Sequence, residues 1–214
     1  MNRYVRYGCM CILCSLLSFP FTYGDAAGKT RAEDFSYQNV ALGDTEDTLL
    51  TRWGAPDVQK EEAIWGIHLK TFTYGDIVVS TSAANGKVVD INLIGENYRL
   101  RKDIRFGTTG SYLLKVYGKT ERQFLDGYTC YVFHHPTQPH KRLILNLDPE
   151  HGALISTRIT MLPLTDEEAD EMALSDDESF IELDLKRGII ASKEIDISAL
   201  PEANNAKLGG GYNK

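Results

Sequence analysis

The chain has little cysteine outside its first residues. Three of its four cysteines lie within the first 14 residues, and only Cys130 lies further along. If the beginning of the chain is removed during export, the remainder has no pair of cysteines for an internal disulfide, so the hydrophobic core must stabilise the fold. Cys130 lies in the strand-like run 128–133, where a small buried hydrophobic residue is a commoner role than a reactive thiol.

The sequence also lacks the motifs of common catalytic sites. It has no Gly-x-Ser-x-Gly elbow of a hydrolase, and the glycine run 209–211 is not followed by the Lys-Ser/Thr of a phosphate loop. The acidic stretch 166–184 does not have the ligand spacing of an EF-hand. We therefore predict no catalytic residue, no metal site and no cofactor, and interpret the protein as non-enzymatic.

Three neighbouring histidines favour an alternative. Imidazole is a common zinc ligand, and His134, His135 and His140 lie close together in the chain. Adjacent residues on a strand point to opposite faces, however, and no acid or cysteine stands at ligand spacing. A metal-dependent hydrolase that uses the segment His134–His140 is therefore the second hypothesis. It requires these histidines to converge with an acid in one pocket. A small-ligand carrier or a structural envelope protein is the third.

Positive charge is also scarce in one part of the chain. Residues 25–165 carry 17 acids and 16 Lys or Arg, whereas residues 166–214 carry 13 acids and 5 bases. The first part is nearly neutral and the second is strongly acidic. Since no basic stripe is present, we do not expect nucleic acid as a partner.

No apolar run is long enough for a stable transmembrane span, which needs about 20 residues. The apolar run Cys9–Phe21 follows Arg3 and Arg6, a pattern typical of an export signal. We predict a signal peptide over residues 1–24 and a flexible leader over 25–37. None of the early cysteines follows a Leu-(Ala/Ser)-(Gly/Ala) run, so lipid anchoring is not favoured. The expected location is the periplasm or the exterior.

Two stretches 64 residues apart, Gly43–Pro56 and Gly107–Thr120, resemble each other. Each begins with glycine and a polar capping residue, continues with apolar residues at a spacing of 0, +1 and +4, and ends with glycine. The matched residues are Gly43 and Gly107, Thr45 and Thr109, Leu49-Leu50 and Leu113-Leu114, Trp53 and Tyr117, and Gly54 and Gly118. Similarity at a fixed spacing favours an internal duplication with one short helix in each copy.

Alternating apolar and polar residues predict three strands after each helix. The predicted strands are 64–74, 77–82, 88–94, 128–134, 142–147 and 154–160. Residues 57–62 and 123–126 are interpreted as loops, and Asn85-Gly86 as a tight hairpin turn. The expected fold class is α+β, with two tandem repeats over 38–97 and 98–162. Each repeat is a short helix on a three-stranded antiparallel meander. The sequence leaves open whether the two sheets join as one. An acidic segment with a helix over 166–174 and a disordered tail fill residues 163–214.

These units resemble the β-lactamase inhibitor protein superfamily, which includes the SmpA/OmlA (BamE) outer-membrane assembly lipoproteins. The resemblance is carried by Gly43, Thr45, Leu49, Leu50, Trp53, Gly54, Pro56, the run Asn85–Val89 and Ile91. The second copy has Thr120 where proline would stand. The resemblance implies a protein that binds other proteins or assists envelope assembly.

The first functional hypothesis is therefore an exported, non-catalytic protein-binding module of the cell envelope. Aromatic side chains on an open sheet face would anchor the partner, as they do in many protein contacts. We select the strand aromatics Trp65, Phe72, Tyr74 and Tyr131 as the binding residues.

Overall fold

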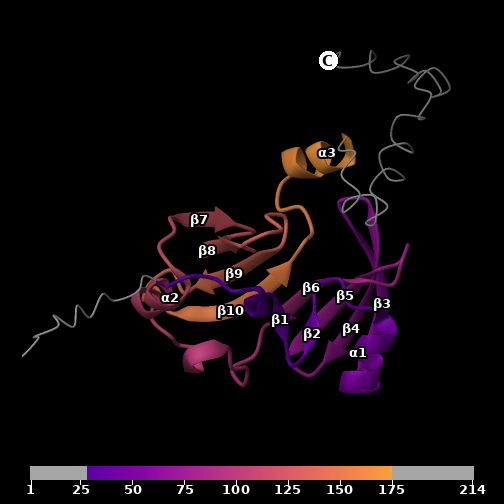
Figure 1. The fold of residues 1–214 in the computed structure, drawn as a ribbon, viewed down its shortest axis with the longest axis horizontal. Coiled ribbons are helices and arrows are strands. Elements are labelled where there is room, and N and C mark those ends of the chain that lie inside the picture. Colours follow the sequence, from indigo (N-terminus) through magenta and orange to yellow (C-terminus); the bar gives the residue numbers. More distant parts are fainter. Residues whose placement is uncertain (1–27, 175–214) are drawn as a thin grey trace, which may run out of the picture.

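One antiparallel sheet of eight strands dominates the fold (Figure 1). The computed structural model describes residues 28–174. The strands are β3 (Val58–Ile64), β4 (Ile67–Tyr74), β5 (Ile77–Ser82), β6 (Val88–Leu93), β7 (Arg122–Leu125), β8 (Tyr128–His134), β9 (Arg142–Leu147) and β10 (Leu154–Thr160). Their order in the sheet is β3-β4-β5-β6-β10-β9-β8-β7. Each set of four strands therefore runs from an outer edge to the centre, where β6 pairs with β10.

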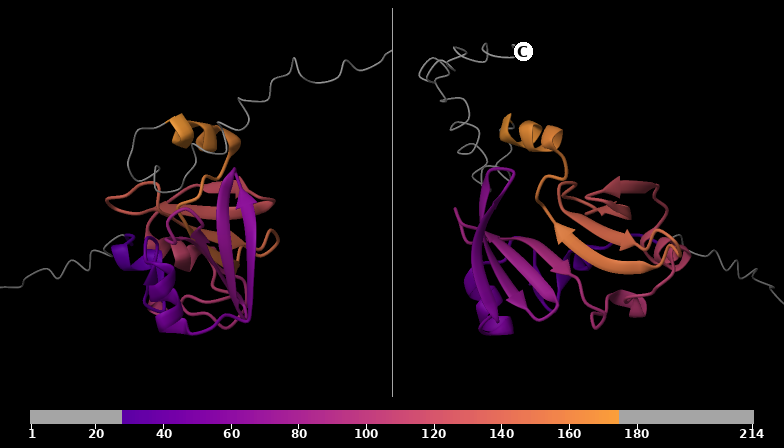
Figure 2. Two further views of the ribbon diagram at one scale, coloured as in Figure 1. Left: turned by 90° about the vertical axis from the view of Figure 1, so that its right-hand side faces the viewer. Right: turned by 180° about the vertical axis from the view of Figure 1, so that it is seen from behind.

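The remaining elements are short. They are η1 (Ala32–Phe35), β1 (Ser36–Tyr37), β2 (Val40–Ala41), α1 (Glu46–Trp53), η2 (Arg101–Asp103), α2 (Gly110–Tyr117) and α3 (Asp166–Leu174). β1 and β2 form a two-stranded sheet, and with η1 they lie across the middle of the large sheet, while α1 and α2 lie toward its two ends (Figures 1 and 2). No helix within residues 28–174 has the length and hydrophobicity needed to cross a bilayer.

The predicted α+β fold, in which each repeat is a helix on a three-stranded meander, is wrong. The protein is mostly β, and each half supplies four strands to a single sheet. The two strands that the sequence did not indicate, β3 and β7, are the edges of that sheet. An edge strand can be solvated on both faces, so β3 has none of the alternation that predicts a strand, and residues 58–61 are all exposed.

The predicted strand 64–74 is interrupted near its beginning. Trp65 and Gly66 have φ angles of 55° and 77° and form the turn between β3 and β4. Positive φ at both central residues is typical of a two-residue hairpin turn. The Asn85-Gly86 turn, in contrast, is wider than predicted, because β5 ends at Ser82 and β6 begins at Val88.

The two similar stretches do form helices, with their ends close to the capping residues. Thr45 Oγ1 accepts a hydrogen bond from the Thr48 N–H at 3.2 Å at the start of α1. Gly54 and Gly118 follow α1 and α2 with φ angles of 80° and 107°, and each donates its N–H back to the last turn. Glycine is favoured there because a Cβ atom strains this backbone conformation.

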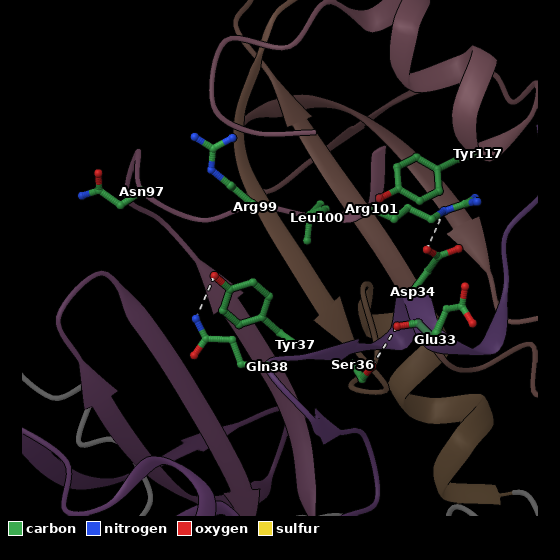
Figure 3. Close-up of a pocket in the computed structure, with 10 residues that line it drawn as sticks. All are labelled: Glu33, Asp34, Ser36, Tyr37, Gln38, Asn97, Arg99, Leu100, Arg101 and Tyr117. Atoms are coloured by element: carbon green, nitrogen blue, oxygen red, sulfur yellow. Dashed lines mark hydrogen bonds and ion pairs between the residues drawn. The ribbon is translucent and has the colours of Figure 1, made fainter. Parts of the chain in front are cut away.

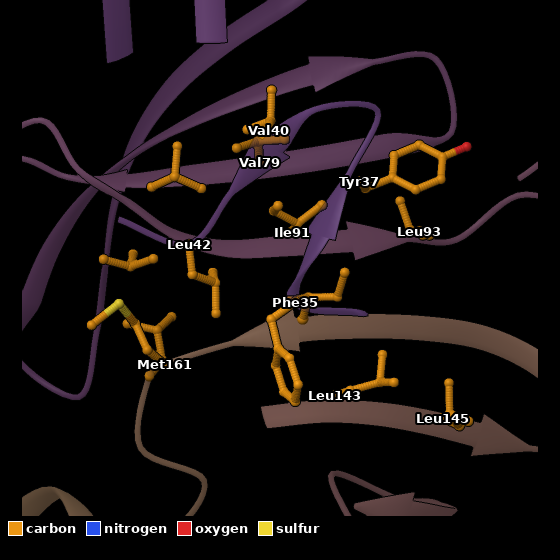
Figure 4. Close-up of a cluster of buried hydrophobic side chains, with 14 of the residues drawn as sticks. Phe35, Tyr37, Val40, Leu42, Val79, Ile91, Leu93, Leu143, Leu145 and Met161 are labelled. Atoms are coloured by element: carbon orange, nitrogen blue, oxygen red, sulfur yellow. The ribbon is translucent and has the colours of Figure 1, made fainter. Parts of the chain in front are cut away.

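The segment 25–37 was expected to be a flexible leader, but its described part is ordered against the sheet. Phe35 and Tyr37 are only 2% and 7% exposed. Figure 4 shows Phe35 against Leu143, beside the central strands. Burial of two aromatic side chains outweighs the entropy lost by ordering a short segment, so η1 and β1 are part of the core.

The core side of the large sheet is a continuous row of apolar residues that face each other across neighbouring strands. The row is Phe72, Val79, Ile91, Ile159, Leu143 and Phe133. Residues directly opposite each other in antiparallel strands lie on the same face, and Figure 4 shows Val79, Ile91 and Leu143 beneath η1 and β1–β2.

The predicted helix over 166–174 is confirmed as α3. The predicted signal peptide over residues 1–24 and the predicted disordered tail lie outside the described residues.

We expect Ile91→Ala to lower the free energy of unfolding by about 2–5 kcal/mol, since Ile91 is 0% exposed at the centre of this row. Val58→Ala is the control, because Val58 is 56% exposed on the edge strand β3, and its cost should stay near 0.5 kcal/mol. Urea unfolding of both variants measures the difference. Equal costs would show that the central row does not carry the core.

Candidate interaction surface

The four aromatics selected from the sequence do not form one surface. Phe72 and Tyr131 are 1% and 3% exposed and belong to the core. Tyr74 is partly buried, and its hydroxyl donates a hydrogen bond to the Gly54 carbonyl at 3.2 Å. Trp65 is exposed, at the turn between β3 and β4. Phe72 and Tyr131 are therefore not available to a partner in this conformation.

The histidines of the alternative hypothesis do not converge either. His134 Nδ1 lies 2.7 Å from the Pro139 carbonyl oxygen. The ring of His135 packs edge-on against Phe35 at 4.8 Å, and burial there lowers its pKa, with a further contribution from Lys141. Within residues 28–174, no three His, Cys, Asp or Glu side chains are placed to hold a metal ion. The pocket that a metal-dependent hydrolase requires is not observed there.

A different group of exposed hydrophobic residues gathers near the turn between β7 and β8. Ile94, Phe124 and Tyr128 are 52%, 74% and 47% exposed. Asp126 and Gly127 form this turn, with φ angles of 51° and 85°. Ile94 and Tyr128 line the same groove, of about 160 Å³, together with the partly buried Leu125 and Leu164. Phe124 pairs with Thr129, whereas Leu125 pairs with Tyr128, so Phe124 lies on the opposite face of this hairpin. We call Ile94, Leu125, Tyr128 and Leu164 the turn patch.

The floor of this groove is polar and hydrogen-bonded. The Arg158 guanidinium lies 2.7 Å from Asp90 Oδ1 and 3.7 Å from Asp126 Oδ2. Asn146 Nδ2 donates to Ser156 Oγ at 2.9 Å. An apolar rim over a floor of fixed polar groups suits the capture of one side chain of a partner, because the floor fixes its orientation and the rim contributes the apolar contact.

Cys130 lies beneath this region and is fully buried. It packs with Val132 and Ile144, and Leu164 covers the three. Burial raises the pKa of the Cys130 thiol, and the negative charge of Asp126 adds to the shift. A thiol that is neutral and covered has little reactivity, so Cys130 acts as a small core residue, as its strand position predicted.

A second depression, of about 350 Å³, lies between η1 and the linker that precedes η2 (Figure 3). Its central charges are paired, since Arg101 Nε lies 2.7 Å from Asp34 Oδ1. The same guanidinium donates to the carbonyls of Lys29 and Val116 at 2.6 and 2.9 Å and stacks on the ring of Tyr117 at 4.8 Å. Arg101 therefore connects three segments, and its role is structural.

No protein-family model matches the chain, and no curated protein matches its sequence. A cysteine-rich secretory protein from Staphylococcus aureus is similar in structure, with 13% identity and a TM-score of 0.42, over 67% of this chain and 52% of that one. An extracellular SCP-domain protein from Bacillus anthracis has 15% identity and a TM-score of 0.43, over 74% and 61%. The uncharacterized protein yfeY from Escherichia coli has 12% identity and a TM-score of 0.43, over 61% and 99%. The chain spans about half to three fifths of the first two proteins, and similarity this low carries no argument about its function.

Phe124 was missed because residues 123–126 were interpreted as a loop. The Asp126-Gly127 dipeptide, between two apolar runs, is a hairpin signal. It would have indicated a strand on both sides of the turn, and thereby the exposed position of Phe124.

We expect Arg101→Gln to lower the free energy of unfolding by about 2 kcal/mol at pH 7, since it leaves the Asp34 carboxylate buried without a cation. Burial already raises the pKa of Asp34, against the opposing effects of the Arg31 backbone and Arg101. A carboxyl whose pKa is raised in the folded state binds a proton more tightly there than in the unfolded chain, so the deficit of the variant should shrink as the pH falls from 7 toward 5.

The control is Arg99→Gln, which breaks the pair of Arg99 with Asp103, both about 60% exposed. It should change stability by less than about 0.5 kcal/mol at either pH. Thermal unfolding at both pH values gives the comparison. A deficit of Arg101→Gln that is the same at pH 5 and pH 7 would contradict the role assigned to Asp34.

Proposed function

We propose that the chain is an exported protein-binding module of the cell envelope, without a reaction centre of its own. Its partner is a protein segment held by the turn patch at the β7 edge of the large sheet. The observation that carries the proposal is the exposure of Ile94 and Tyr128 beside a groove with a polar floor. Aromatic anchors around a small pocket are the usual centre of a protein contact.

The contrast between the two edges of the sheet supports this site. β3 carries Lys60, Glu61 and Glu62 in succession, and charges of this kind discourage pairing with another chain. β7 carries a single charge, Arg122, and the most exposed of the large hydrophobic side chains in the described chain, Phe124. Among the described residues, β7 is hydrogen-bonded to β8 alone. An extended segment of a partner can therefore add to β7 by backbone hydrogen bonds.

The sequence favours an exported protein that binds another protein. The basic and apolar pattern of residues 1–24 favours export, and the resemblance to the β-lactamase inhibitor protein superfamily favours protein binding. Both are predictions from residue patterns. The site itself follows from exposure and charge within residues 28–174.

We expect Tyr128→Ser to weaken capture of the partner at least tenfold, because an anchoring aromatic typically contributes 1–2 kcal/mol or more. The chain and its variants are incubated with solubilised envelope proteins, and the proteins that they retain are quantified. Ile94→Ser should reduce the same retained protein, since Ile94 lines the same groove.

Trp65→Ser is the matched control, since Trp65 is also exposed but lies at the far turn between β3 and β4. It should retain the partner like the unmodified chain. The proposal fails if no envelope protein is enriched, or if Trp65→Ser loses the partner as strongly as Tyr128→Ser does.

A further inference from the structure

A basic groove lies at the end of the molecule formed by η2 and α2. It has a volume of about 440 Å³ and is lined by five cationic side chains and no carboxylate. The five are Lys29, Arg31, Arg101, Lys102 and Lys115. In a chain with a net charge of −7, a groove lined by one sign of charge focuses the electrostatic field on an anionic ligand.

Several of these charges are not neutralised within the protein. Arg31 pairs with Glu33 and Arg101 with Asp34. No carboxylate in the described part of the chain pairs with Lys29, Lys102 or Lys115, and all three side chains are exposed. The groove therefore offers at least three ammonium groups to an external anion.

Two exposed aromatic residues extend the groove. Lys102 and Tyr112 also line an adjoining depression that contains Arg105, Phe106 and Asp103, and the Asp103 carboxylate pairs with Arg99. Phe106 and Tyr112 are 39% and 40% exposed, and the Tyr112 hydroxyl donates to the Lys102 carbonyl at 3.2 Å. Amphipathic aromatic side chains next to Lys and Arg are typical of the boundary between water and a lipid bilayer.

Gly28 lines the groove and lies directly against the last turn of α2, because a Cβ atom at Gly28 would come within 2.2 Å of the Lys115 carbonyl oxygen. The backbone that carries Lys29 is therefore held beside α2. The flanking aromatic rings favour a lipid surface over a dissolved anion, because a bilayer offers apolar contact next to its phosphates.

We propose that the face formed by the basic groove, Phe106 and Tyr112 binds the surface of an anionic lipid bilayer. The ammonium groups contact lipid phosphates, and the two aromatic rings enter the headgroup region. The proposal is independent of the turn patch, which lies at the β7–β8 turn, so one chain can contact a bilayer and a protein partner together.

The test is co-sedimentation of the full 214-residue chain with vesicles of phosphatidylcholine alone, or with one quarter phosphatidylglycerol. Binding to the anionic vesicles should exceed binding to the neutral ones by at least tenfold at low salt, and should fall as salt is raised. Lys115→Gln and Lys102→Gln should each reduce anionic binding about fivefold, since one Lys near such a surface contributes about that factor.

Two controls separate this face from other causes of binding. Lys60→Gln removes one exposed charge from β3 and should bind like the unmodified chain. Phe124→Ser should also bind normally, whereas Phe106→Ser should bind more weakly; circular dichroism confirms that each variant is folded. Equal binding to neutral and anionic vesicles would show that the apolar run alone drives association and would overturn the proposal. The proposal would also be overturned if Lys60→Gln and Lys115→Gln lost anionic binding equally. Binding would then depend on the net charge of the protein and not on this face.

Discussion

The pairing of β6 with β10 is the constraint on which the architecture depends. Four residue pairs, from Leu93–Thr157 to Asp90–Thr160, align these strands, and they are the contact that makes one sheet from two sets of four. The Arg158–Asp90 ion pair crosses the same junction at 2.7 Å, while Ile91 and Ile159 face each other on the core side. A slip of one residue would move every apolar side chain of one half to the other face, so polar and apolar contacts specify the same register.

The sequence predicted the bounds of individual strands more accurately than the arrangement of the strands in the sheet. Four of the six predicted strands have the bounds that alternation indicated, among them those over 128–134 and 142–147. Alternation is visible only where one face of a strand is buried and the other is solvated. The edge strands β3 and β7 have little buried surface, so their residues were interpreted as loops. Their absence reduced each half to a three-stranded meander, and whether the two meanders join in one sheet was left open.

The binding residues show a similar limit. A period of two assigns residues to faces, but it does not tell which face the rest of the chain covers. Phe72 and Tyr131 share the core side with Ile91. Tyr131 lies against the start of α2, where a Cβ atom at Gly110 would come within 3.3 Å of its hydroxyl. Phe124 is exposed for the opposite reason, because its strand is at the edge, where no neighbouring strand covers it.

The cover over the core also sets the position of the basic face. The buried side chains of Phe35 and Tyr37 fix the segment that follows Gly28 against the core. The Arg101 guanidinium donates hydrogen bonds both to the Lys29 carbonyl and to the Val116 carbonyl at the end of α2. The chain therefore enters its fold at a fixed place, beside Lys102 and Lys115. Because the entry point is fixed, Lys29 is held beside Lys102 and Lys115 on one face of the molecule. The turn patch lies at a different part of the sheet, where a partner can reach it.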